Sequence, residues 1–253
     1  MYNFQYMKIQ QYLDSTYLKT PSQAGLSFLE NTKIVESYIQ EAIEEGFKLI
    51  MIRPEMVKLA NKMIQDANSK LTIGTVIGFP EGTYSLDEKL AEAQRAIEDG
   101  ADDLDFVCNY EAFKRGETQL VKKEILEGTK LGLSHNKIVK WIIEVAALNG
   151  EQIIQLSALI KNVVMANFGE VCYPSVFVKS STGFYKSEGG LPNGATVPTI
   201  LMMLENASPL SIKAAGGVRT YEEALEMIRL GVKRIGTSSA KAIVKGQVAN
   251  ESY

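Results

Sequence analysis

Short runs rich in β-branched and aromatic residues alternate along this chain with longer amphipathic segments, and this alternation constrains the fold more than any other feature. The strand-like runs recur about every 25 to 35 residues, and the segments between them carry apolar residues at helical spacing. Strands that alternate with helices form a parallel sheet, because each helical crossover returns the chain to the same edge. The predicted strands are 12–18, 48–52, 71–79, 103–108, 138–145, 175–181, 210–215 and 234–238.

Seven amphipathic segments between these runs predict helices. Several carry start or stop signals, such as the capping box of Ser85 with Glu88, Pro54 in a first turn, and Gly100 after a last turn. The predicted helices are 32–45, 54–67, 85–99, 117–131, 151–167, 195–206 and 221–230.

Eight strands in 253 residues match a closed (β/α)8 barrel, the TIM barrel of the α/β class. An open, doubly wound sheet is the alternative. No Pro/Ser-rich linker or abrupt change of composition divides the chain. We therefore expect a single barrel domain over 1–253, with a flexible carboxyl-terminal tail at about 246–253.

The composition excludes several classes of partner. A net charge of −3 and a pI of about 5.5 provide no electrostatic attraction to nucleic acid or to an anionic membrane. Neither the first 13 residues nor any other stretch forms an apolar run of membrane-spanning length. Cys108 and Cys172 are the only cysteines, in or beside apolar runs, so we expect reduced thiols and a cytoplasmic location.

The single histidine narrows the chemistry. His135 lies in a predicted turn between a helix and a strand, whereas catalytic zinc sites commonly draw two or three histidines. It also leaves few ways to build a Ser-His or Cys-His nucleophile pair. The census therefore argues against a zinc mechanism and indicates chemistry that depends on lysine, carboxylate, tyrosine and backbone groups.

Two lysines lie near the carboxyl ends of consecutive predicted strands. Lys179 and Lys213 interrupt apolar runs and are followed closely by glycine and small residues, whereas most of the 27 Lys and Arg residues should be solvated. A lysine with a pKa near 10.4 is almost entirely protonated at neutral pH. Two ammonium groups about 5 Å apart repel by about 3 kcal/mol at an effective dielectric of about 20, which lowers a pKa by about two units. The pair therefore indicates a nucleophilic lysine and Schiff-base chemistry.

In a barrel, alternate strand residues point inward, which predicts which side chains meet inside. Lys179 and Lys213 then share the interior with Asp105, which is either a proton relay or only a structural partner for a lysine. The predicted inward-facing sets are Asp103, Asp105 and Val107; Lys140, Ile142 and Glu144; Phe177, Lys179 and Ser181; and Ser211, Lys213 and Ala215.

Glycines and hydroxyls follow three successive strands on the lysine side. Barrel enzymes often bind phosphate with the loops after strands seven and eight, where glycine lets the backbone amides approach an anion. The sequence therefore predicts a phosphate site. Its candidate residues are Gly183, Gly216, Gly217, Gly236, Ser238 and Ser239, with Thr182 beside them.

These motifs together resemble the deoxyribose-phosphate aldolases, a Schiff-base aldolase family of deoxynucleoside catabolism. The resemblance runs from LDSTYL at 13–18 through GFPEG at 78–82, GADDLD at 100–105 and VKWIIE at 139–144 to VKSSTG at 178–183, KAAGGVR at 213–219 and GTSS at 236–239. It implies a TIM barrel that reversibly cleaves 2-deoxy-D-ribose 5-phosphate to acetaldehyde and D-glyceraldehyde 3-phosphate. It also implies Lys179 as the Schiff-base lysine, Lys213 as the neighbour that lowers its pKa, Asp105 as a proton-transfer partner with Asp14 nearby, and a homodimer.

The chain departs from the family pattern in several places. Ser180 stands where threonine is usual, and Phe184 where some relatives have a lysine that adds positive charge near the phosphate. The stretch 184–194 is longer than usual, and Asn109 and Tyr110 vary a loop that should face the site. Some relatives have a carboxyl-terminal tyrosine that assists proton transfer, which makes Tyr253 a candidate.

Three other readings remain open. The lysine pair also fits a Schiff-base aldolase for a different phosphosugar. A phosphate-binding barrel isomerase or synthase could use lysine as a non-covalent acid. An idle sugar-phosphate binder would also carry the glycine-rich loops.

Overall fold

Eight parallel strands close into a barrel in the computed structural model, which describes residues 8–186 and 194–246. Each strand pairs with the next, and β8 returns to β1 through the register Asp14↔Gly236. The closed barrel confirms the (β/α)8 prediction and rules out the open sheet. The strands are β1 (Leu13–Thr16), β2 (Leu49–Ile52), β3 (Thr72–Ile77), β4 (Asp103–Val107), β5 (Ile138–Ile142), β6 (Val176–Lys179), β7 (Ser211–Ala215) and β8 (Arg234–Thr237).

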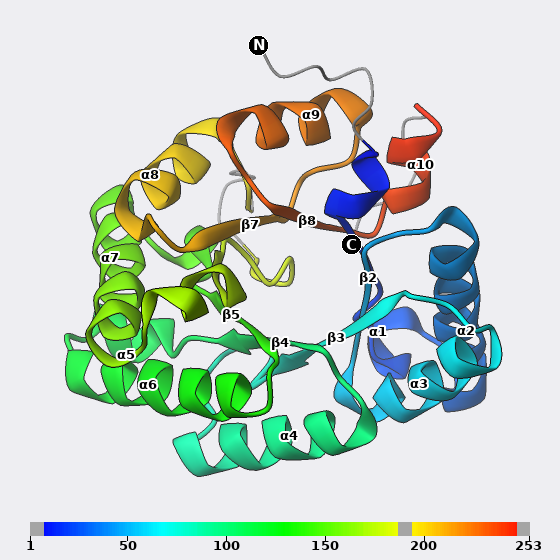
Figure 1. Cartoon of the computed structure of the whole chain (residues 1–253), viewed down its shortest axis with the longest axis horizontal. Coiled ribbons are helices and arrows are strands. Elements are labelled where there is room, and N and C mark those ends of the chain that lie inside the picture. The colour runs from blue at the N-terminus through cyan, green and yellow to red at the C-terminus, as the bar shows by residue number, and fades with distance from the viewer. Residues whose placement is uncertain (1–7, 187–193, 247–253) are drawn as a thin grey trace.

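Helices surround the ring of strands, as Figure 1 shows. The longer helices are α2 (Phe28–Glu45), α3 (Val57–Asp66), α4 (Leu86–Asp99), α6 (Thr118–Ser134), α7 (Gly150–Asn167), α8 (Val197–Ala207) and α9 (Tyr221–Leu230). Shorter helices are α1 (Pro21–Ala24), α5 (Tyr110–Lys114) and α10 (Ala240–Val244), with 3-10 turns at η2 (Ile9–Tyr12), η3 (Pro54–Met56), η4 (Val145–Ala147) and η5 (Glu170–Ser175).

The predicted elements all occur, with differences at their ends that have local causes. Helix α2 starts at Phe28, earlier than predicted, because Ser27 and Glu30 form a capping box that satisfies its first amides. Strand β5 ends at Ile142, because the chain turns at Glu144 with φ of 52°. Helices α1 and α5 are too short to produce a periodic pattern, so they were not predicted. The predicted tail, except Gly246, lies outside the described residues, and so does Tyr253.

Outward-facing strand residues form the larger core, against the helices. Trp141 is fully buried there, with its ring 4.9 Å from that of Phe106 at an interplanar angle of 24°. The indole Nε1 donates a hydrogen bond to Thr129 Oγ1 of α6 at 3.0 Å, which fixes the ring against this helix. Trp141 therefore shows the predicted alternation, since its strand neighbours Lys140 and Ile142 face inward.

Inside the barrel, the two halves differ in chemistry. Strands β2 and β3 contribute apolar side chains, among them Leu49, Met51 and Val76, to a second cluster that Leu18 and Phe79 extend toward the mouth. Strands β4 to β8, with β1, contribute ionised side chains, although Val107 of β4 and Ile142 of β5 also belong to the apolar cluster. Across the described ranges, no helix is long and apolar enough to cross a membrane.

We expect Gly128→Ala to destabilise the protein by about 1–3 kcal/mol, although alanine favours helices. A Cβ on Gly128 of α6 would lie 2.8 Å from the Trp141 ring, which its stacking and hydrogen bond prevent from moving. Gly169→Ala is the control, because its φ is −70° and no described atom lies within 4 Å of the added Cβ. Denaturant unfolding checks this prediction, and equal stabilities of the two variants would contradict it.

Candidate active site

Asp105 lies at the centre of the ionised half of the barrel and contacts three lysines from three neighbouring strands. Its Oδ2 accepts hydrogen bonds from Lys179 Nζ at 2.9 Å and Lys213 Nζ at 3.0 Å, and its Oδ1 from Lys140 Nζ at 2.7 Å. All four side chains are buried. The predicted inward directions of Asp105, Lys140, Lys179 and Lys213 are therefore confirmed, and Asp105 contacts both lysines expected at the reaction centre.

Asp14 and Asp103 extend this network toward β1 and the base of β4. Lys213 Nζ lies 2.6 Å from Asp14 Oδ2, and Lys140 Nζ lies 2.6 Å from Asp103 Oδ2. Arg234 of β8 joins both carboxylates, with Nη2 2.6 Å from Asp14 Oδ1 and 3.2 Å from Asp103 Oδ2. Among the described side chains the network holds four cations and three carboxylates, so one positive charge is in excess.

Arg234 was not among the predicted site residues. The sequence did contain a signal for this residue, because strand alternation places Arg234 on the same inward face of β8 as Gly236. Gly236 is needed there, since a Cβ would lie 3.0 Å from Lys213 Cε.

The three lysines differ in how many carboxylates hold them. Within the described residues, Lys140 and Lys213 each contact two carboxylates, whereas Lys179 contacts Asp105 alone. Burial lowers the pKa of Lys140, but Asp103 and Asp105 more than offset this and raise it above its ordinary value. For the Lys179 ammonium, Asp105 offsets only part of the effect of burial, and the pKa falls to about 8. Lys179 is therefore the group suited to lose a proton near neutral pH.

The cause of this lowered pKa differs from the prediction. Burial of Lys179 is the largest effect, Asp105 opposes it, and repulsion by Lys213 adds to it after these. The sequence argument assigned the whole effect to the neighbouring cation, because solvent exclusion cannot be read from a strand pattern. For Asp105, burial raises the pKa, but the three lysines hold it well below its usual range, so it remains a carboxylate.

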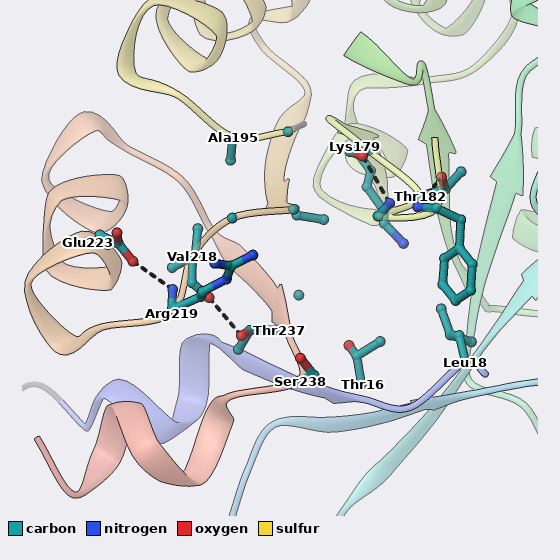
Figure 2. A pocket seen from close by; sticks show the side chains of 18 of the residues that line it. Thr16, Leu18, Lys179, Thr182, Ala195, Val218, Arg219, Glu223, Thr237 and Ser238 are labelled. Atoms are coloured by element: carbon teal, nitrogen blue, oxygen red, sulfur yellow. Dashed lines mark hydrogen bonds between the residues drawn. The ribbon is translucent and has the colours of Figure 1, made fainter. Parts of the chain in front are cut away.

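A cavity of about 470 Å³ opens above the network (Figure 2). Lys179 lines this cavity, whereas Lys213 and Asp105 are not among its lining residues and are fully buried beneath it. Of the ionised network, only Lys179 is therefore presented to a molecule in the cavity, among the residues that the structure describes.

The loops after β7 and β8 form the end of the cavity away from Leu18, where Figure 2 places Val218, Arg219 and Thr237. Gly183, Gly216, Gly217, Gly236 and Ser238 all line it, as predicted. In the described part of the chain, the amides of Gly217 and Ser238 donate no hydrogen bond, which leaves them available to an anion. Ser239 does not line the cavity, and its amide donates to Thr237 Oγ1 at 3.0 Å.

Arg219 adds a positive charge to this end and was not predicted as a site residue. It follows Gly217 and Val218, its backbone amide donates to Glu223 Oε2 at 2.7 Å, and its side chain points into the cavity in Figure 2. A cation two residues after a glycine pair was the signal that could have identified it. The glycine loops and Arg219 together suit a phosphate group.

The opposite wall is apolar. Leu18 and Phe184 line the cavity there, and the Phe184 ring meets the Phe79 ring edge-on at 5.2 Å. The Arg53 guanidinium lies 4.7 Å from the Phe79 centroid, and its Nε donates to Leu18 O at 2.7 Å. Phe184 therefore forms part of an aromatic wall. Its predicted effect, a lower positive charge at the phosphate, stays a prediction.

The chain is similar to known proteins over nearly its whole length. Residues 10–246 match the model of the DeoC/LacD family aldolases. The chain belongs to the DeoC/LacD aldolase family. It is 38% identical to the deoxyribose-phosphate aldolase of Thermococcus kodakarensis over 94% of this chain and 96% of that protein.

Solved structures of aldolases share the architecture. The aldolase QR15 is similar with a TM-score of 0.79 and 30% identity, over 94% of this chain and 95% of that one. The deoxyribose-phosphate aldolase of Aeropyrum pernix, described as a tetramer, is similar with a TM-score of 0.75 and 26% identity, over 94% and 89% of the two chains.

We expect Arg234→Met to lower the free energy of unfolding by about 3–5 kcal/mol, because Asp14 and Asp103 lose a buried cationic partner. Arg115→Met is the matched control. Arg115 contacts Glu117 at 2.6 Å on the surface, where such a pair contributes less than about 1 kcal/mol. Chemical denaturation of both variants measures the difference, and a loss below 1 kcal/mol for Arg234→Met would contradict the assigned role.

Proposed function

We propose that this DeoC/LacD family aldolase is a class I deoxyribose-phosphate aldolase that uses Lys179 as its Schiff-base nucleophile. The observation that carries the proposal is the position of Lys179, which has a pKa of about 8 and is the network lysine that lines the cavity. The substrate proposed is 2-deoxy-D-ribose 5-phosphate, split reversibly into acetaldehyde and D-glyceraldehyde 3-phosphate. The relatives named for this activity support the choice.

The cavity offers a place for each part of the substrate. The phosphate would lie against Gly216, Gly217, Ser238 and Arg219, and the aldehyde carbon against Lys179. The neutral Lys179 amine adds to this carbon, and the resulting carbinolamine takes up one proton from solvent and loses water, which forms a protonated imine. When the C3 hydroxyl loses its proton, the C2–C3 bond breaks and its electrons flow into the imine, which leaves an enamine of acetaldehyde and frees D-glyceraldehyde 3-phosphate.

Asp105 and Lys213 assist these reaction steps. Asp105 moves protons, and Lys213 balances the negative charge of Asp105. Asp105 Oδ2 bridges Lys179 and Lys213, which supports a path for the proton that Lys179 must lose before it attacks. Protonation of the enamine and hydrolysis of the imine by water then release acetaldehyde and restore the amine. We assign the enzyme no cofactor, a cytoplasmic location, a role in deoxyribonucleotide catabolism, and a homodimeric state.

Reduction with borohydride in the presence of 2-deoxyribose 5-phosphate should attach a substrate-derived adduct to Lys179, detected by mass spectrometry of its peptide. Lys179→Ala should lose the adduct and lower kcat by about 10⁴-fold or more, as loss of a covalent nucleophile does. Equal adducts from other sugar phosphates would instead favour a different phosphosugar. Demonstrated binding with no adduct on any lysine would exclude the covalent mechanism and leave a non-covalent barrel enzyme or an idle binder.

Cyanoborohydride trapping of acetaldehyde should become faster as pH rises toward about 8 and level off above it, because only the neutral Lys179 amine attacks. Lys213→Met removes a like charge, so the pKa of Lys179 should rise and the midpoint should move to higher pH. Lys241→Met, on the surface beside Glu41, is the control and should leave the midpoint unchanged. A midpoint for Lys213→Met at or below that of the unaltered protein would contradict this charge effect.

A further inference from the structure

Glu144 is a fully buried carboxylate that the proposed reaction does not use. It lies two residues after the end of β5 and adopts the left-handed backbone conformation, with φ of 52° and ψ of 71°. This conformation is unfavourable for a side chain such as glutamate and persists only where the surrounding contacts stabilise it. The contacts made by Glu144 therefore indicate what this position does.

Those contacts are with the loop that follows the nucleophile. Glu144 Oε1 accepts a hydrogen bond from Ser181 Oγ at 2.9 Å. Its Oε2 accepts one from the Thr182 amide at 3.0 Å and another from the Thr182 hydroxyl. The backbone on either side adds support, since Ile143 N donates to Lys179 O at 3.0 Å and Val145 N to Ser180 O at 2.9 Å.

The hydroxyls that Glu144 holds in turn fix the rest of the loop. Ser181 Oγ accepts from the Gly183 amide at 2.9 Å, and Thr182 Oγ1 accepts from the Phe184 amide at 3.1 Å. On the other side, Ser180 Oγ joins the loop to β7, donating to Ala215 O at 2.7 Å and accepting from Ala215 N at 2.9 Å. Hydrogen bonds therefore run continuously from Glu144 to the cavity wall.

This wall belongs to the cavity that Lys179 and the glycine-rich loops after β7 and β8 also line. Ser181, Thr182 and Gly183 line the cavity, whereas Glu144 is not among the lining residues. Both Glu144 oxygens are occupied by loop donors, so the carboxylate is not directed at a substrate. Its effect must pass through the loop.

We propose that Glu144 is a positioning residue that holds the Ser181–Gly183 wall in the shape that accepts a phosphate-bearing substrate. The proposal rests on the proposed function for the identity of that substrate. It requires a specific loss of phosphate recognition when the carboxylate is removed, while the amine of Lys179 keeps its reactivity.

Glu144→Gln tests this, because the amide has nearly the same shape but replaces one acceptor oxygen with a donor that faces the loop donors. The dissociation constant of inorganic phosphate, measured by calorimetry, and KM for 2-deoxyribose 5-phosphate should rise about tenfold or more. KM for unphosphorylated 2-deoxyribose, and cyanoborohydride trapping of acetaldehyde on Lys179, should change less than about twofold.

Glu92→Gln is the matched control, since Glu92 Oε2 accepts from the Gly78 amide at 2.7 Å and holds a loop after β3 instead. It should leave phosphate affinity unchanged. Should Glu144→Gln fail to fold, Thr182→Val removes one hydroxyl donor from the same carboxylate and should weaken phosphate binding in the same direction by a smaller factor.

Unchanged phosphate affinity in Glu144→Gln would overturn the proposal, and so would an equal rise in KM for both sugars. A wild-type protein that does not bind phosphate would overturn it too. The aldolase proposal has a separate test, because it fails if the wild type traps no acetaldehyde on Lys179. In that case the phosphate titration would still test the role of Glu144.

Discussion

The three ammonium groups that share the Asp105 carboxylate are the interaction on which the rest of the site depends. Three lysines cannot lie together inside a barrel without a buried carboxylate between them, because the desolvated cations would repel strongly. Asp105 meets Lys140, Lys179 and Lys213, which are 35, 74 and 108 positions away in the sequence. Barrel closure brings their strands side by side and makes the contact possible.

The lysines of this network differ in reactivity because different numbers of carboxylates offset the cost of burying their charges. Lys140 has two carboxylate partners and a raised pKa, whereas Lys179 has one and a lowered pKa. The apolar half of the barrel, with Leu18 and Phe184 at its mouth, excludes water on one side, and burial is the largest cause of the low pKa of Lys179. Lys179 lies at the edge of the cavity, inside the barrel. The barrel therefore both lowers the pKa of the nucleophile and encloses the space in which a substrate can bind.

Much of the fold followed from periodicity alone. The two-residue period of β5 placed Lys140 inside and Trp141 outside, and both lie where the pattern predicted. The glycine pair after β7, and Gly236 with the hydroxyl residues that follow it at the end of β8, predicted the loops that line the anion end. Strand parity and a nearby glycine pair marked Arg234 and Arg219 as candidates. What these two residues and Glu144 do could not be read from the sequence, because their partners or the cavity they face come from other strands and loops.

The sequence by itself determined the alternation of strands and helices, the inward direction of Lys179, Lys213 and Asp105, and the family to which the chain is similar. These properties are local or periodic, so they can be read along the chain. The tertiary structure decided which lysine has one carboxylate partner and reaches the cavity, and it joined Arg234 to Asp14 across 220 positions. A pKa depends on solvent exclusion and on distances through space, and neither exists until the barrel closes.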